Sequence, residues 1–177
     1  MSKRLKIYVA GPMSGHKYFN FPVFDEIANS LRKLGHEVFN PADIDRSLGF
    51  DPSTLSVDTD WKKVHAFDYI KGARENNVLI SKDVEAVLKC DILLLLMLPG
   101  WCVSKGSIAE LALAVWSGKK IYRAHFSSRK CGCCEECSGY EQCDSRRIEL
   151  DRMFLSMAQE TSGDQKMYME AVFGNAV

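Results

Sequence analysis

Apolar residues are most concentrated between Ile92 and Leu98, where seven follow one another without a polar residue. Such a run is typical of a strand that is buried on both faces of a parallel sheet. A loop with glycine and serine follows, and apolar residues then recur at helical spacing from Ile108 until Gly118. The pattern predicts a central strand, a loop and a helix, in that order.

The start of the chain repeats this order of elements. Its hydrophobic pattern predicts a strand at 5–10, a turn at 11–15, and a helix from Asn20 to Gly35 with proline in its first turn. A short strand at 37–40 should follow, ended by Pro41. Further along, Ser81 is expected to start a helix, and residues 118–124 to form a strand.

Alternating strands and helices predict a small doubly wound parallel sheet, Rossmann-like or flavodoxin-like, with four or five strands and helices on both faces. The 177 residues fit a single domain, 1–177. Two further helices are expected, one starting near Ser145 and one at 166–173.

Residues 46–79 are an insertion that this fold does not require. The stretch 53–57 is expected to be a loop, and residues 61–71 a short helix that Gly72 ends. Its aromatic residues allow two interpretations. The insertion is a lid over a ligand site, or Trp61 and Phe67 cover the edge of the sheet as ordinary packing.

Charge and hydropathy restrict the possible partners. The chain has 23 basic and 23 acidic residues, so no overall positive field attracts a nucleic-acid polymer. The longest apolar run has seven residues, whereas a membrane-spanning helix needs about 20. The polar N-terminus runs straight into a predicted strand without a signal-peptide pattern, so a cytoplasmic protein is expected.

Two loops are the candidate ligand site, because they leave the carboxyl ends of predicted parallel strands. The second of them precedes a helix N-terminus, where backbone amides and the helix dipole favour an anion. Neither loop has the spacing of a Walker motif or of a dinucleotide-binding fingerprint. The candidate substrate-binding residues are Gly11, Met13, Ser14, Gly15, Ser104, Gly106 and Ser107.

Three parts of the sequence resemble the nucleoside 2-deoxyribosyltransferase-like superfamily, in particular a group of short phage and bacterial proteins. They are residues 8–15 (YVAGPMSG), the segments NFP at 20–22 and VFNP at 38–41, and the stretch from Asp83 to Ala114. The resemblance covers roughly residues 5–45 and 80–123. Better-known relatives cleave or exchange the bond between base and sugar in deoxynucleosides or nucleoside 5′-monophosphates.

The resemblance implies roles for three residues. Glu110 would be the nucleophile at C1′ of the sugar, Ser104 would bind a 5′-phosphate, and Asp83 would lie near the base and the ribose. It also implies a homodimer whose sites are completed across the interface.

The residue types suit this chemistry without a cofactor. Breaking an N-glycosidic bond builds positive charge at C1′, which a carboxylate stabilises or captures covalently. The departing base needs a proton, which a desolvated carboxylic acid can deliver. Each acid also has a structural alternative. Glu110, expected in the first helical turn, could only complement the helix dipole, and Asp83 could be a first-turn acid of its own helix. Asp91 is expected to end that helix.

The sequence therefore predicts an N-glycosidase that hydrolyses a (deoxy)nucleoside 5′-monophosphate. A nucleoside 2-deoxyribosyltransferase and a non-catalytic nucleotide-binding module are the alternatives. A zinc-organised interaction protein on a degenerate enzyme scaffold is a third.

Five of the seven cysteines lie between Cys131 and Cys143, in a polar segment at about 129–144. Disulfides are rare in cytosolic proteins, whereas two nested C-x-x-C spacings suit a metal. An iron-sulfur cluster or redox-active thiols are alternatives to structural zinc. Cys133 is the expected spare thiol, although spacing does not distinguish it from Cys131. The isolated Cys90 and Cys102 are expected to be packing residues. The predicted zinc ligands are Cys131, Cys134, Cys137 and Cys143.

Protein purified under reducing conditions should therefore contain about one zinc ion per chain, with Zn–S distances of about 2.3 Å. Chelation should lower stability before it affects any chemistry at Glu110, because the metal would be structural. Elemental analysis that finds no metal would contradict this prediction. Sulfur pairs at about 2.05 Å would replace it with disulfides.

Overall fold

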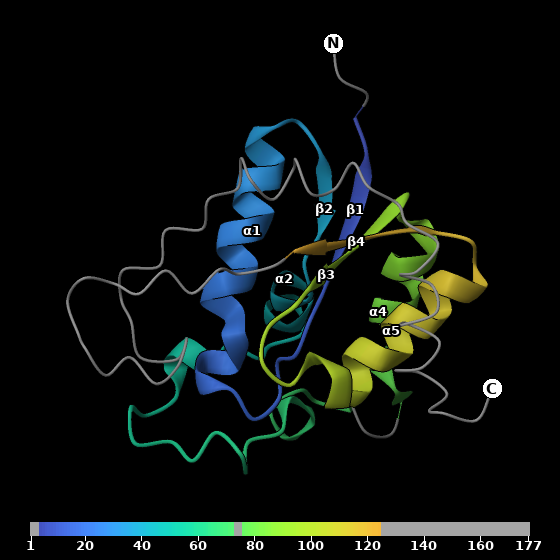
Figure 1. Ribbon diagram of the computed structural model, residues 1–177. Coiled ribbons are helices and arrows are strands. Elements are labelled where there is room, and N and C mark those ends of the chain that lie inside the picture. Colours follow the sequence, from blue (N-terminus) through green and yellow to red (C-terminus); the bar gives the residue numbers. More distant parts are fainter. Residues whose placement is uncertain (1–3, 73–75, 125–177) are drawn as a thin grey trace.

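The computed structural model describes residues 4–72 and 76–124 (Figure 1). The cysteine-rich segment, with its predicted zinc ligands, lies outside these ranges, as do the two helices predicted near Ser145 and at 166–173.

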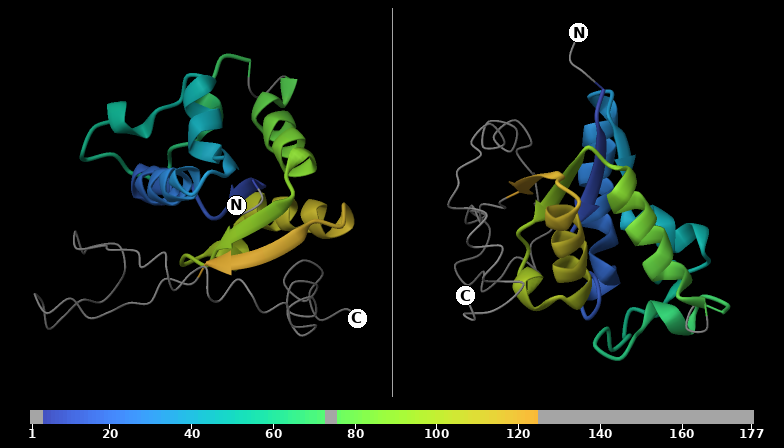
Figure 2. Two further views of the ribbon diagram at one scale, coloured as in Figure 1. Left: turned by 90° about the horizontal axis from the view of Figure 1, so that it is seen from above. Right: turned by 90° about the vertical axis from the view of Figure 1, so that its right-hand side faces the viewer.

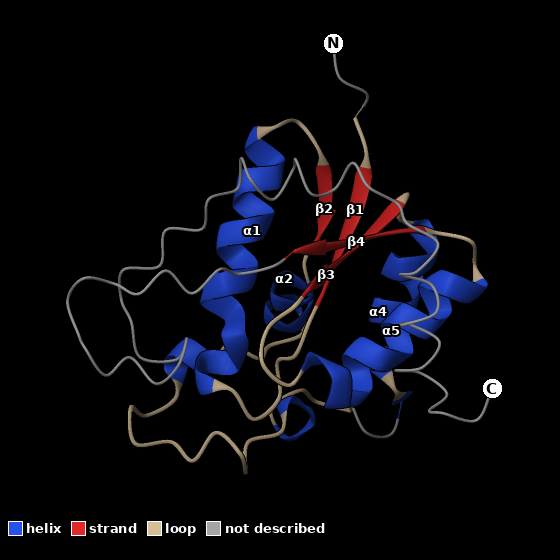
Figure 3. Cartoon of the chain, viewed as in Figure 1, coloured by secondary structure: helices blue, strands red, loops and turns tan. Residues whose placement is uncertain are grey.

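The described part of the chain contains a parallel sheet of four strands, β1 (Lys6–Ala10), β2 (Glu37–Phe39), β3 (Ile92–Leu96) and β4 (Lys120–Ala124). Their order across the sheet is β2-β1-β3-β4 (Figure 3). The chain therefore passes from β1 to a neighbour on one side, and later enters β3 on the other side. The loops that leave β1 and β3 flank this reversal, which is where open α/β sheets bind ligands.

In the described part of the chain, four helices accompany the sheet: α1 (Phe21–Lys33), α2 (Pro41–Ser47), α4 (Val78–Lys89) and α5 (Lys105–Trp116). The helix α1 lies on one side of the sheet, and α4 and α5 lie on the other (Figure 1). The helices α4 and α5 pack against each other (Figure 2), while α2 contacts both α1 and α4. This confirms the predicted doubly wound α/β class.

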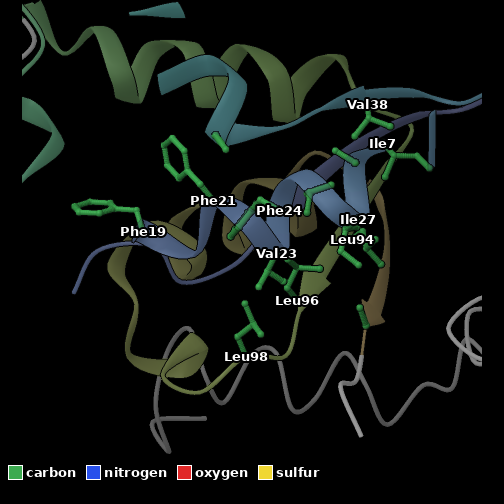
Figure 4. Close-up of a cluster of buried hydrophobic side chains, with 14 of the residues drawn as sticks. Ile7, Phe19, Phe21, Val23, Phe24, Ile27, Val38, Leu94, Leu96 and Leu98 are labelled. Carbon is green, nitrogen blue, oxygen red and sulfur yellow. The ribbon is translucent and has the colours of Figure 1, made fainter. Parts of the chain in front are cut away.

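Alternation along β1 and β3 divides the core into two clusters. Ile7, Leu94 and Leu96 face α1 (Figure 4). Val9 belongs to the same cluster. Tyr8 faces α4 and α5 from the other side of β1. All five residues of β3 are buried, as the unbroken apolar run predicts for a strand covered on both faces.

Gly11 is needed where β1 ends because the chain there packs closely on its neighbours. A Cβ at this position would lie 3.1 Å from both Leu96 Cβ and Phe24 Cζ. In the loop after β3, a Cβ on Gly100 would lie 3.7 Å from His16 Nε2. The loops after β1 and β3 therefore approach each other, as the topology requires.

The predicted helix at 61–71 is wrong. Within this segment the only helical turn is a short 3₁₀ turn at Ala66–Asp68. Trp61 instead packs on Tyr18 and Phe19, with ring centroids 5.0 and 6.4 Å apart. Trp61 and Phe67 both lie against the buried cluster that faces α1, so they have the packing role. Contacts distant in sequence override the weak local helix preference here.

The predicted start of α1 is confirmed, since Asn20 is the N-cap residue and proline lies in the first turn. The Asn20 side chain donates to the Pro12 carbonyl (2.7 Å) and makes no capping hydrogen bond. Two other predicted helix starts need correction. The helix α4 begins at Val78 rather than at Ser81, and α5 begins at Lys105. Among the described residues, no helix combines the length and apolar character needed to cross a membrane.

Candidate functional site

A buried tyrosine hydroxyl lies between two carboxyl groups on the side of the sheet that α4 and α5 cover. Tyr8 is 0% exposed. Its Oη is 2.9 Å from Glu110 Oε1 and 3.2 Å from Asp83 Oδ1. These three side chains come from β1, α5 and α4, so packing of both helices on the sheet brings together residues more than seventy positions apart.

The position of Glu110 follows from where α5 begins. Ser104 is the N-cap, and its Oγ accepts from the Ser107 amide (3.4 Å) and the Ser107 hydroxyl (3.0 Å). Glu110 is therefore in the second turn, and the expectation that it lies in the first turn is wrong. Because the dipole effect falls off within the first turn, it does not account for an acid at this place.

The position of Asp83 follows from α4 in the same way. The helix starts at Val78, so Asp83 is an interior residue and its interpretation as a first-turn acid is wrong. Leu79, Ala86 and Val87 are the buried residues of α4. Asp83 lies at helical spacing from them, which places its carboxyl group toward Tyr8. The predicted pairing of Asp83 with Glu110 is found, with Tyr8 between them.

Burial makes Glu110 a weak acid. Glu110 as a whole is half-buried, but its Oε2 atom is buried and has no hydrogen-bond partner among the described residues. Desolvation, together with the charges of Asp83 and Asp45, raises the pKa of Glu110 to about 8, against the lowering effect of the Tyr8 hydrogen bond. Desolvation also raises the pKa of Asp83 to about 6. Burial and the two neighbouring acids raise the pKa of Tyr8, which therefore stays protonated.

Asp45 is a third acid in this region, and the sequence interpretation missed it. It lies on α2 and is 7% exposed. Desolvation and the charge of Asp83 raise its pKa to about 7, although Arg46 acts in the opposite direction. One signal could have revealed it. Asn40 and Pro41 are a strong helix start, and Asp45 falls on the same helical face as the buried Pro41 and Ala42.

Arg46 anchors α2 beside α1. Its Nη2 is 2.5 Å from Asp25 Oδ2, its Nη1 is 3.3 Å from Asp43 Oδ1, and its guanidinium lies 4.8 Å from the centre of the Phe21 ring. The Asn40 amide also donates to Asp25 (3.2 Å). These contacts fix the helix that carries Asp45.

The candidate loop residues differ in accessibility. Gly11 is buried and Met13 packs against the core, whereas Ser14, Gly15 and Gly106 are exposed. Ser104 is half-buried as the helix cap, and Ser107 is buried.

Three further predictions concern residues near β3. Asp91 follows α4 as expected, and its Oδ2 accepts from the Lys6 amide (2.8 Å). Cys90 is buried, as predicted, but Cys102 is exposed, so its predicted packing role is wrong. Cys102 follows β3 in a short 3₁₀ turn at Trp101–Val103 that has no buried residue.

Comparison with known families gives one match. The model of a family described as a domain of unknown function (DUF4406) matches residues 5–71, less than half of the chain. The matched part contains Tyr8 and Asp45, whereas Asp83 and Glu110 lie beyond it. No curated protein matches the chain. Within residues 4–72 and 76–124, no group of three His, Cys, Asp or Glu side chains is placed to hold a metal ion.

Stability should fall as the pH rises from about 4 to about 8. Asp83, Asp45 and Glu110 have raised pKa values of about 6, 7 and 8 in the folded protein, against about 4 when unfolded. The folded state therefore binds more protons than the unfolded state in this range. The measurement is the free energy of unfolding in urea at several pH values.

In Glu110→Gln, the free energy of unfolding should fall less steeply at the high-pH end of this range. The substitution removes the carboxyl group with the highest of the three pKa values. Glu85→Gln is the control, since it removes an exposed carboxyl group from α4 and should preserve the wild-type slope. Stability that rises between pH 5 and pH 8 would contradict the burial of three protonated acids.

Proposed function

We propose that the chain is an N-glycosidase that hydrolyses the bond between base and sugar in a (deoxy)nucleoside 5′-monophosphate. The observation that carries the proposal is the Glu110 carboxyl group, which has one oxygen held by Tyr8 and the other buried with no partner among residues 4–72 and 76–124. A desolvated oxygen without a hydrogen bond is costly for folding. It is more reactive toward a developing positive charge than an oxygen in water.

The proposed reaction divides the work between the two acids. The Glu110 carboxylate forms a bond to C1′ as the bond from C1′ to the base nitrogen breaks, and Asp83 gives its proton to the leaving base. Water then attacks C1′, passes a proton to Asp83 and releases Glu110 as a carboxylate. The hydrogen bond with Tyr8 holds Oε1 and so orients the Glu110 carboxyl group.

The start of α5 supports a phosphate site close to these acids. The first intrahelical bond runs from the Ile108 amide to the Ser104 carbonyl (3.0 Å), so the amides of Lys105 and Gly106 precede it. Amides at this position suit an anion. In the proposal they hold the 5′-phosphate together with the Ser104 hydroxyl, and the exposed Ser14 and Gly15 approach from the loop after β1.

Burial of the acids also favours a second candidate reaction. A glycosyl-enzyme shielded from water would survive long enough for another base to accept the sugar, which is the reaction of a nucleoside 2-deoxyribosyltransferase. Incubation of the common nucleotides with and without an added free base, followed by chromatography, separates the two. Release of free base supports hydrolysis, exchange supports transfer, and saturable binding without turnover supports a binding module. A homodimer and a structural zinc ion belong to the proposal only through the resemblance and the cysteine spacing.

Glu110→Gln should lower the rate of base release by roughly 10²-fold or more while ligand binding is retained, because the variant keeps the shape and removes the charge. The measurement is the single-turnover rate on the best nucleotide from the chromatographic screen. Glu85→Gln is the matched control on an exposed face of α4 and should react like the wild type. Turnover by Glu110→Gln at the wild-type rate would exclude Glu110 from the mechanism.

Ser104→Ala should weaken the use of monophosphates and leave the use of nucleosides unchanged, since it removes one charge-assisted hydrogen bond of about 1.5–3 kcal/mol. Ser104 is also the cap of α5. Ser104→Gly is therefore the second variant, because glycine replaces a capping serine at a cost of only a few tenths of a kcal/mol. In both variants, the ratio of kcat/KM for monophosphates to kcat/KM for nucleosides should be smaller than in the wild type, and by the same factor. Equal use of nucleoside and monophosphate by the wild type would assign another role to this loop.

A further inference from the structure

We propose that the Tyr8 hydroxyl relays a proton between Glu110 and Asp83, and so converts the empty site into its reactive form. The inference rests on the proposed function, because it supplies the protonation states which that reaction needs. It is carried by the position of Tyr8 Oη between two carboxyl oxygens, at 2.9 and 3.2 Å.

The number of hydrogen atoms in this arrangement is limited. A tyrosine hydroxyl has one proton to donate, whereas an ionised carboxylate can only accept. Tyr8 therefore cannot donate to Glu110 and Asp83 at the same time. Both contacts are hydrogen bonds only if one carboxyl group is itself protonated and donates to Tyr8 Oη. The three groups then form a chain in which the acid at one end and the carboxylate at the other can exchange roles.

In the empty site the proton belongs on Glu110. Its Oε2 is buried and has no partner in the part of the chain that the structure describes, and burial there costs a neutral carbonyl oxygen less free energy than a carboxylate oxygen. A protonated Oε1 donates to Tyr8 Oη, and the Tyr8 proton is then directed at Asp83 Oδ1. The higher pKa of Glu110, about 8 against about 6 for Asp83, agrees with this order.

The proposed reaction needs the opposite arrangement, with Glu110 ionised to attack C1′ and Asp83 protonated to serve the base. One concerted shift provides it. The proton on Glu110 Oε1 moves to Tyr8 Oη while the Tyr8 proton moves to Asp83 Oδ1. Tyr8 is neutral before and after, and the total charge does not change. Positive charge developing at C1′ favours the shift, because it stabilises the Glu110 carboxylate. After hydrolysis the reverse shift restores the empty site.

The surrounding groups help to keep a proton within the chain. Asp45 on α2 adds negative charge that raises the pKa of Glu110. Arg46, on the same helix, acts on Asp45 in the opposite direction, but its guanidinium is held by Asp25, Asp43 and the face of Phe21. Full ionisation of these neighbouring, desolvated acids is therefore unfavourable near neutral pH.

The resting arrangement can be tested without a substrate. The probe is the chain labelled with ¹³C at the carboxyl carbons of Glu and Asp and titrated by NMR. At pH 7 the spectrum should show one protonated glutamate, and its signal should be missing in Glu110→Gln. The signal of Asp83, which is assigned by its loss in Asp83→Asn, should be that of a mostly ionised carboxyl group. In Tyr8→Phe the pKa of Asp83 should rise, because in the resting arrangement its carboxylate accepts the one Tyr8 proton, and that hydrogen bond lowers its pKa. An ionised Glu110 in the wild type at pH 7 would overturn the relay even if nucleotides are cleaved.

The transfer itself is tested by single-turnover rates in mixtures of H₂O and D₂O, with the nucleotide that the wild type cleaves fastest. Because two protons move in the same step, a plot of the wild-type rate against the deuterium fraction of the solvent should be curved, not straight. Tyr8→Phe should be at least about tenfold slower, mainly in kcat, with a straight dependence. Tyr122→Phe, on the neighbouring part of the sheet, is the matched control and should keep both the rate and the curve.

Two outcomes would count against the relay in different ways. Retained curvature in Tyr8→Phe, or a rate within twofold of the wild type, would overturn it and leave the glycosidase proposal intact. Absence of any nucleotide cleavage by the wild type would overturn the proposed function and the catalytic use of the relay. The NMR titration would then still decide where the proton lies.

Discussion

The hydrogen-bonded contact of Tyr8 with Glu110 and Asp83 is the interaction on which the rest of this site depends. It joins the centre of the sheet to two helices, and its geometry requires that α4 and α5 pack on the same face of β1. The close approach at Gly11 and the N-cap at Ser104 set the loops around it. Moving either helix by one residue would turn its acid away from Tyr8.

Burial of these acids lowers the stability of the fold, compared with apolar residues at the same positions. Leu93 and Leu95 of β3 and Ala86 of α4 belong to the same cluster as Tyr8 and show the packing available to it. Glu110 Oε2 is buried and has no partner among the described residues, which lowers stability, and burial raises the pKa of the group. Strongly perturbed acids with a specific partner are typical of functional sites, which is the physical basis of the proposed glycosidase.

Local pattern was sufficient for most of the fold and for two of the site residues. The four described strands and the parallel α/β class follow from apolar runs and from glycine and proline positions. Glu110 and Asp83 were expected together, but as first-turn candidates, because each helix begins three residues earlier than its strongest sequence signal. Tyr8 was expected only as a strand residue. Asp45 was missed because its burial depends on contact between α2 and α4, which is distant in sequence. The helix expected at 61–71 failed for the same reason, since Trp61 packs on Tyr18 and Phe19.

The central claim is that Glu110 forms a covalent bond with the sugar. The most direct measurement is mass spectrometry of the chain after incubation with 2′-fluoro-arabinonucleotides, whose fluorine slows hydrolysis of a glycosyl-enzyme. The account predicts a sugar phosphate adduct on the peptide that contains Glu110, absent from Glu110→Gln. Base release without an adduct on that peptide, or an adduct on a different carboxyl group, would contradict it.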